Sequence, residues 1–188
     1  MDAAPRMIPD LKLRHMGMFV RDIGVMCAFY CDVLGFVITD RGDVRGHHAV
    51  FLSRDPRSHH QLVMETGRAD AGGAGLGLQQ ISFQVEKLED LRAMHRLVSG
   101  RTDTGLVQAV DHGNAWSLYF RDPEANRIEI YMDTPWYVAQ PHVADLNLNL
   151  DDAAILAATH ARVGDDPTML PVVQWQSALA AKIAAGRN

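Results

Sequence analysis

The sequence predicts an α+β protein with two βαβββ units, whose strands form a cupped, partly closed mixed β-sheet, followed by a helical C-terminal extension. Two observations support this fold class. One strand, one amphipathic helix and three further strands occur in residues 11–67, and the same order returns in residues 78–135. In both units, one strand face is aliphatic and the other polar, as in sheets that carry helices on a single face. The polar faces would line a cup for a ligand.

The first unit begins with a strand expected at residues 11–20. Asp22 is a suitable N-cap for a helix at residues 23–34, and Gly35 is suited to end that helix. Strands are then expected at residues 36–41, 48–53 and 60–65, with RGD at 41–43 and SRDPRS at 53–58 interpreted as the turns between them.

The second unit follows a glycine- and alanine-rich linker at residues 68–77. A strand is expected at residues 78–85, a helix at 88–98, and strands at 107–110, 115–120 and 127–132. The two units would form a single domain at residues 11–138. The remainder, residues 139–188, is expected to contain about two helices, which serve as a solvated cap or dimer clasp, or alternatively as a lid over the site.

Composition and charge exclude several classes of function. The 188 residues suit one well-buried domain, and the hydrophobic and charged fractions, 47% and 22%, are those of a soluble globular protein. A net charge of -5 without a Lys/Arg cluster argues against nucleic-acid and anionic-membrane partners. No apolar run reaches the roughly 20 residues of a membrane span, and no signal peptide is recognisable. Cys27 and Cys31 are expected to be reduced, so we expect a cytoplasmic location.

The hairpin at residues 111–133 contains an unusual carboxylate, Glu129. Glutamate is a poor strand former, so a glutamate within a strand either points to water or is held for a purpose. Its neighbours Ile128 and Ile130 favour a central strand, and Glu129 would then face the cup. The first strands of the two units place His15 and Gln80 at equivalent positions on the same polar face.

Nine histidines are many for a chain of this length. His15, His60 and His112 fall in or beside predicted strands, where a metal or acid–base site would need them. Ordinary structural roles are the alternative for each candidate residue. His15 would be a satisfied core histidine and Gln80 a hydrogen-bonding liner of the cup. His60 and His112 would face water, Tyr119 would pack in the core, and Glu129 would be solvated.

Two motifs resemble the vicinal oxygen chelate superfamily. FYCDVLGF lies in the first helix, RDPEANRIEIY closes the second unit, and the resemblance extends over about residues 11–137. The superfamily includes glyoxalase I, bleomycin- and fosfomycin-resistance proteins and type I extradiol dioxygenases, and the chain is most similar to the extradiol dioxygenases. This resemblance implies an enzyme that cleaves a catechol-type aromatic substrate with O2. It also implies a homodimer, since small members are often homodimers.

The resemblance also assigns roles to individual residues. The metal-ligand positions hold His15, Gln80 and Glu129, and His60, His112 and Tyr119 hold the positions that act on substrate and oxygen. The dioxygenases have a histidine where this chain has Gln80. Fe(II) is the metal that the resemblance favours, whereas a neutral glutamine oxygen also suits Mn, Ni or Zn. A glyoxalase-like isomerase or lyase, and a non-catalytic binder of a small aromatic ligand, are the alternative functions.

Overall fold

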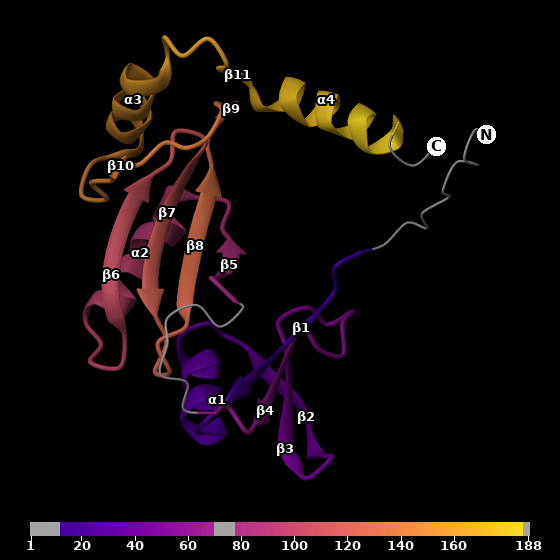
Figure 1. The fold of residues 1–188 in the computed structure, drawn as a ribbon. Helices are drawn as coiled ribbons and strands as arrows, with labels where there is room; N and C mark the ends of the chain where they lie inside the picture. Colours follow the sequence, from indigo (N-terminus) through magenta and orange to yellow (C-terminus); the bar gives the residue numbers. More distant parts are fainter. Residues whose placement is uncertain (1–11, 70–77, 186–188) are drawn as a thin grey trace, which may run out of the picture.

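The computed structural model describes residues 12–69 and 78–185 and has the expected α+β fold (Figure 1). The first unit contains β1 (Met16–Val20), α1 (Ile23–Asp32), β2 (Val37–Val44), β3 (His47–Ser53) and β4 (Leu62–Thr66). The second unit contains β5 (Ile81–Gln84), α2 (Leu88–Ser99), β6 (Gly105–Asp111), β7 (Ala115–Arg121) and β8 (Arg127–Asp133). Leu11 and most of the predicted linker, residues 70–77, lie outside the described residues.

Each unit folds its strands into one mixed sheet. The first sheet has the order β1-β4-β3-β2, and the second has the order β10-β6-β7-β8-β5, where β10 is the short strand Ala144–Asp145. β1 is parallel to β4 and β5 is parallel to β8. Within residues 12–69 and 78–185, no strand pair joins the two sheets, so β1 and β5 are edge strands.

The first helix begins at the predicted residue, Ile23, and ends at Asp32, two residues before the predicted end at residue 34. Asp22 is the N-cap of α1, because its Oδ1 accepts a hydrogen bond of 3.0 Å from the backbone N–H of Val25. After the helix, Gly35 has a φ of 67°, in the left-handed region that glycine adopts without strain. Its N–H donates to the carbonyl oxygen of Cys31 at 3.2 Å.

The prediction of a turn at the RGD stretch is wrong. Residues 41–43 lie within β2, which continues to Val44 and pairs with β3 in an antiparallel hairpin. The two residues between these strands are Arg45 and Gly46, and both have positive φ, 53° and 85°. Positive φ at both central residues matches the twist of two antiparallel strands, so this pair makes the hairpin connection.

Three predicted strands begin later than expected. β1 begins at Met16, β4 at Leu62 and β5 at Ile81, rather than at residues 11, 60 and 78. His15 and Gln80 therefore directly precede their strands, and His60 lies two positions before its strand. All three candidate residues are outside the hydrogen-bonded ladders.

One apolar core spans both units. It includes residues from α1, α2 and the helix-facing sides of both sheets. Two aromatic contacts cross between the units: Phe29 with Phe120, at 6.5 Å between ring centroids, and Phe36 with Phe83, at 5.9 Å. Burial of such large rings is a major source of stability, so the core alone makes the units interdependent.

The turn at residues 122–126 forms a second, polar connection between the units. Asp122 accepts hydrogen bonds from within the turn and from the Tyr30 hydroxyl of α1 at 3.2 Å. Glu124 accepts from the backbone N–H groups of Arg21 and Asp22, at 2.6 and 2.8 Å, where β1 passes into α1. The two sequence motifs therefore contact one another.

The C-terminal extension contains the predicted two helices, α3 (Asp152–Val163) and α4 (Val172–Ala185). α3 is anchored to the second unit: Thr159 accepts from Trp116 Nε1 at 2.8 Å, and Arg162 pairs with Asp111 at 2.6 Å. α4 has no buried residue, and Trp175 stacks on Tyr137 with 5.0 Å between ring centroids.

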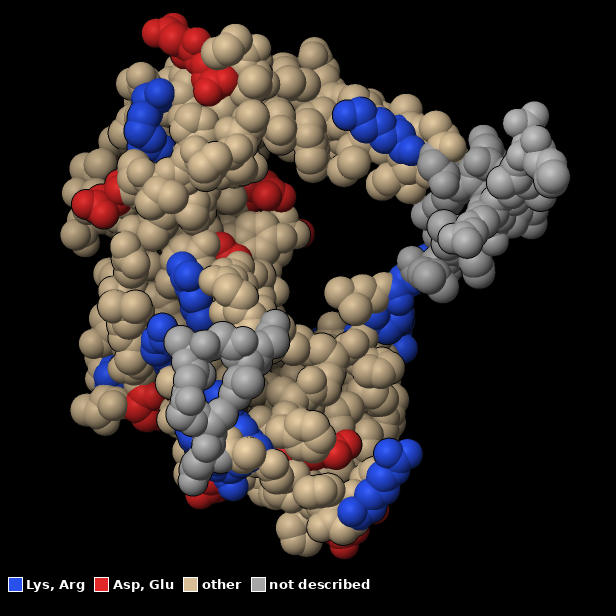
Figure 2. Space-filling view, in the orientation of Figure 1, with Lys and Arg blue, Asp and Glu red and all other residues tan. Residues whose placement is uncertain are grey.

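Figure 1 shows α4 projecting from the body, and Figure 2 shows a hollow between α4 and the first unit. Within the described part of the chain, no helix is both long and apolar enough to cross a membrane.

Candidate functional site

The register of three strands brings Glu129 to the centre of a polar cluster. β8 lies between β5 and β7, and Glu129 is directly opposite Ser82 on β5 and Tyr119 on β7. Residues opposite one another on adjacent strands project to the same face, so these three side chains meet. Gln80, two positions before Ser82, joins them from the same side. The predicted central position of the Glu129 strand is confirmed.

Glu129 is only 8% exposed, so it is not the solvated carboxylate of the alternative interpretation. Its Oε2 accepts hydrogen bonds from Gln80 Nε2 at 2.7 Å and from Ser82 Oγ at 2.5 Å. Its Oε1 accepts from the Tyr119 hydroxyl at 2.5 Å. Hydrogen bonds to a carboxylate are shorter and stronger than those between neutral groups, so three donors fix this side chain in place.

Tyr119 and His112 extend the cluster. The Tyr119 hydroxyl is 2.9 Å from His112 Nε2, and His112 Nδ1 is 2.8 Å from the carbonyl oxygen of His142. Because a carbonyl only accepts, Nδ1 must carry a hydrogen, which makes Nε2 an acceptor when the imidazole is neutral. Tyr119 then has one hydroxyl hydrogen facing two acceptors, Glu129 and His112. Both ring nitrogens of His112 have partners within the protein, so His112 does not simply face water, as the alternative interpretation expected.

Burial raises the pKa of Tyr119 to about 12, and the hydrogen bond and negative charge of Glu129 add to the effect. The Arg127 guanidinium lies over the phenol ring, 4.0 Å from its centroid, and opposes the shift. Tyr119 is therefore a neutral hydrogen-bond donor at physiological pH.

His15 and His60 form a second group, on the first unit. Their ring centroids are 4.4 Å apart, and His60 Nδ1 is 2.9 Å from His59 Nδ1. His15 is exposed and His60 half-buried, so His15 is not a core histidine. Desolvation, followed by the proximity of His15 and His59, lowers the pKa of His60. No hydrogen bond, ion pair or ring contact between described residues joins these two histidines to the Glu129 cluster.

The oxygen atoms of Glu129 and Gln80 are of the chemical type that binds a divalent cation. Gln80 Nε2 donates to Glu129 and to Ser82, at 2.7 and 2.8 Å, which leaves the Gln80 Oε1 oxygen without a partner among the described residues. A carboxylate beside a free amide oxygen suits hard cations. Across residues 12–69 and 78–185, however, no group of three or more His, Cys, Asp or Glu is placed to hold a metal ion. Of the three predicted ligands, His15 lies apart from Gln80 and Glu129.

Ser82 is a member of the cluster that is not among the site residues predicted from the sequence. The sequence did contain a signal for it, because Gln80, Ser82 and Gln84 alternate with apolar residues and so share one face. Its importance depends on the pairing of Ser82 with Glu129, which the sequence alone does not specify. The ring of His142 pairs with Asp166 at 3.5 Å, and His142 contributes only its backbone carbonyl to His112.

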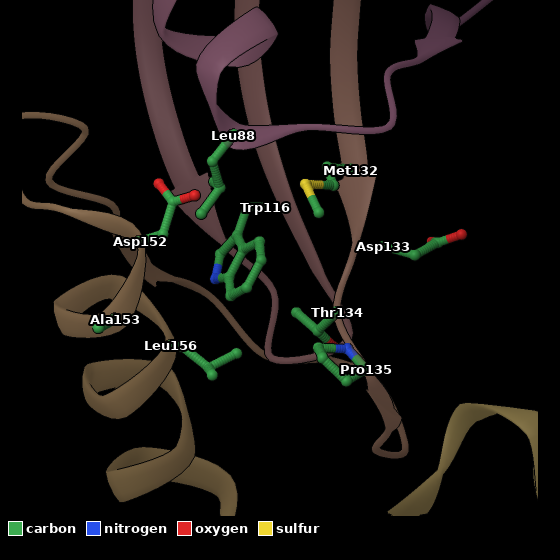
Figure 3. A pocket seen from close by; sticks show the side chains of 9 residues that line it. All are labelled: Leu88, Trp116, Met132, Asp133, Thr134, Pro135, Asp152, Ala153 and Leu156. Atoms are coloured by element: carbon green, nitrogen blue, oxygen red, sulfur yellow. The ribbon is translucent and has the colours of Figure 1, made fainter.

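One cavity beside the second unit does not belong to this cluster. It has a volume of about 370 Å³ and lies between the start of α2, the ends of β7 and β8, and α3 (Figure 3). Trp116 and Met132, which line it, are paired across β7 and β8 and face the helices. Glu129 is an odd number of positions from Met132 along β8 and therefore faces the other side of the sheet.

Comparison with known proteins identifies the family. A model of the Glyoxalase/Bleomycin resistance protein/Dioxygenase superfamily matches residues 12–130, and the chain belongs to this superfamily. Its members are mostly metalloenzymes that act on small molecules.

Individual relatives agree with this assignment. The chain is 28% identical over 128 residues to biphenyl-2,3-diol 1,2-dioxygenase 3 of Rhodococcus globerulus. That match covers 65% of this chain, and the chain spans only 63% of the length of the relative. A glyoxylase/bleomycin resistance protein/dioxygenase domain from Frankia sp. EAN1pec has a TM-score of 0.53 at 22% identity, covering 64% of this chain and 95% of that one. The fosfomycin resistance protein FosX from Mesorhizobium loti has a TM-score of 0.50 at 18% identity, with coverages of 68% and 94%. At these identities, the solved structures support the fold alone.

Proposed function

We propose that this protein is a divalent-metal-dependent enzyme of the extradiol type, which cleaves a catechol-type aromatic ring with O2. The observation that carries the proposal is the buried Glu129 carboxylate, surrounded by Gln80, Tyr119 and His112. The sequence similarity to a biphenyl-2,3-diol dioxygenase supports the same reaction class.

Glu129, Gln80 and His15 would hold the cation, with Fe(II) favoured and Mn, Ni or Zn as alternatives. His15 would be supplied from the first unit. A divalent cation held there would supply Lewis-acid chemistry and would lower the pKa of the substrate hydroxyl groups. Among the residues of the chain, His60 lies beside His15 and accepts the phenolic proton of the substrate.

Tyr119 and His112 position substrate and oxygen. Because the hydroxyl hydrogen of Tyr119 has two acceptors, it turns fully to His112 when Glu129 is engaged elsewhere. The carbonyl of His142 holds the His112 ring in one orientation throughout. With its hydrogen donated to His112, the Tyr119 oxygen is then an acceptor in a fixed position for a hydroxyl group of the bound substrate.

An assay of ring cleavage tests the reaction. Protein loaded anaerobically with Fe(II) and then exposed to O2 should convert at least one of a panel of catechols to a yellow ring-fission product, with one O2 consumed per product. If the loaded protein consumes no O2 with any catechol, the dioxygenase assignment is wrong.

The free oxygen of Gln80 favours one further candidate, a glyoxalase-like isomerase or lyase that tolerates a glutamine ligand. This candidate predicts turnover with Ni or Zn in the absence of oxygen. Unchanged affinity for an aromatic ligand in EDTA, without turnover under either condition, would instead indicate a non-catalytic binder.

Substituting Gln80→His should raise the affinity for Fe(II) by about 10-fold or more, because imidazole is a stronger donor than an amide oxygen for this metal. Anaerobic titration with Fe(II) measures the change. Gln84→His, on the same face of β5 but bonded to Asp133 rather than Glu129, is the matched control. An equal gain in both variants would show that any added histidine suffices, which would remove Gln80 from the proposed ligand set.

A further inference from the structure

A crevice of about 260 Å³ lies between the two units. Met16 and Phe36 line it from the first unit, and Ile81 and Phe83 line it from the second. Phe36 and Phe83 meet edge to face, with 5.9 Å between ring centroids and 70° between ring planes. This volume is below the range of drug-sized ligand pockets, and its apolar walls suit a single aromatic ring.

Several residues that line the crevice are next to predicted site residues in the sequence. Three of its lining residues are the immediate neighbours of predicted site residues: Met16 follows His15, Gln61 follows His60, and Ile81 follows Gln80. Successive side chains of a strand project to opposite faces, so Gln84 is the lining residue that shares the polar face of β5 with Gln80 and Ser82.

Arg54 is the cationic residue of the crevice. Its guanidinium lies next to Gly35, with Nε and Nη2 at 3.8 and 3.9 Å from the position that a Cβ there would take. Its backbone N–H donates to Gln61 Oε1 at 2.9 Å, which ties the start of the loop to its end. Among the described residues, no carboxylate lies within ion-pairing distance of this guanidinium, and no acidic residue lines the crevice.

Two amide side chains complete the polar part of the lining. Gln61 uses its Oε1 for the Arg54 backbone, so its Nε2 is available as a donor beside the guanidinium. Gln84 donates its Nε2 to Asp133 at 2.7 Å, so its Oε1 is available as an acceptor. The crevice thus offers a cation and an amide donor to an anionic group, and an amide acceptor to a hydroxyl group.

We propose that this crevice binds a small aromatic carboxylate, with the ring against the wall that Met16, Phe36 and Phe83 form and the carboxylate on Arg54. If the proposed ring cleavage holds, on which this assignment of substrate class rests, the substrate is a hydroxylated aromatic acid rather than an uncharged diol.

A carboxylate fits the crevice better than a phosphate. One guanidinium forms two parallel hydrogen bonds with a single carboxylate, and Gln61 adds a third donor. A phosphate dianion would need more positive charge than one arginine supplies, and Arg54 is the one Lys or Arg among the lining residues of this crevice.

Calorimetric titration of the full chain in EDTA tests the proposal, with benzoate and the isosteric neutral amide benzamide as probes. Neither probe has two adjacent hydroxyl groups, so binding is independent of any metal. Benzoate should bind about 10- to 100-fold more tightly than benzamide, the usual effect of a charge-assisted hydrogen bond. Arg54→Met should remove that difference and leave the affinity for benzamide unchanged. Arg54→Lys, which keeps the charge without the paired geometry, should give an intermediate affinity for benzoate.

Arg57→Met is the matched control, because Arg57 is in the same loop, 86% exposed, and paired with Asp55 at 3.1 Å. It should bind benzoate like the unmodified protein. Equal affinity for benzoate and benzamide, or full benzoate affinity in Arg54→Met, would overturn the proposal. Inorganic phosphate that displaces benzoate at equal concentration would also overturn it, in favour of a general anion site.

Failure of this proposal is distinguishable from failure of the proposed reaction. Benzoate binding that depends on Arg54, without any ring cleavage, would leave the crevice assignment standing and overturn the reaction. Ring cleavage that prefers catechol itself to 3,4-dihydroxybenzoate, and is unaffected by Arg54→Met, would overturn the crevice assignment alone.

Discussion

Replacement of Glu129 by glutamine is expected to reduce the affinity for divalent cations by more than about 100-fold. Loss of residues that only orient metal ligands typically costs 10- to 100-fold, and Glu129 is the one proposed ligand that carries a charge. Glutamine has nearly the same shape, and the hydroxyls of Ser82 and Tyr119 can either donate to it or accept from it. The fold should therefore be retained.

Metal content after anaerobic loading, together with the midpoint of thermal unfolding in EDTA, tests this prediction. The unfolding midpoint should not fall, since the substitution removes a buried charge. Glu86→Gln, the same chemical change at an exposed position near the end of β5, should leave metal content unaltered. Unaltered metal content in Glu129→Gln would exclude Glu129 as a ligand.

The same substitution should lower the pKa of Tyr119 from about 12 towards the ordinary tyrosine value of 10.0. A negative charge beside the phenol disfavours its ionisation, so removal of that charge makes ionisation easier. Ultraviolet titration of tyrosinate in EDTA measures this effect without any metal, and Tyr119→Phe identifies the contribution of Tyr119 to the curve. If the titration of Glu129→Gln matches that of the unmodified protein, Glu129 and Tyr119 are not coupled in solution.

The sequence predicts most of the fold because its local signals agree with the final structure. The helices of the two units follow from apolar spacing, and the first also follows from its N-cap Asp22. Both signals act within a few residues. The turn predicted at the RGD stretch is wrong because a contact between strands overrides the local signal. The stretch has the composition of a turn, but pairing with β3 determines its conformation, and the left-handed pair Arg45-Gly46 provides the connection instead.

The candidate site is less predictable because it depends on pairing between distant strands. Alternation alone places Glu129 on the polar face, but its partners Ser82 and Tyr119 come from the register of β5 and β7 with β8. The relation of His15 to Glu129 depends on how two separate sheets approach each other, which no local pattern specifies. The turn motif was recognised from sequence, whereas its contacts with α1 are a finding of the structure.

Among the predicted substitutions, one in the turn at residues 122–126 is expected to affect stability the most. Asp122 is 3% exposed and accepts four hydrogen bonds: two from the backbone N–H groups of Glu124 and Asn126, one from Asn126 Nδ2 and one from the Tyr30 hydroxyl. Burial nevertheless raises its pKa, so the desolvation of this carboxyl outweighs its four donors. The turn as a whole joins the second unit to α1, through Asp122 and through Glu124.

Substituting Asp122→Ala should lower the free energy of unfolding by about 3 kcal/mol or more, because several buried donors lose their acceptor at once. Tyr30→Phe removes one of the four donors and should cost only about 1 kcal/mol. Urea denaturation followed by circular dichroism measures both, with the exposed Asp165→Ala as a control expected to stay within about 0.5 kcal/mol of the unmodified protein. Equal losses in Asp122→Ala and Tyr30→Phe would mean that the turn keeps its shape without the carboxylate. In that case the aromatic contacts of the core, rather than this polar connection, would hold the two units together.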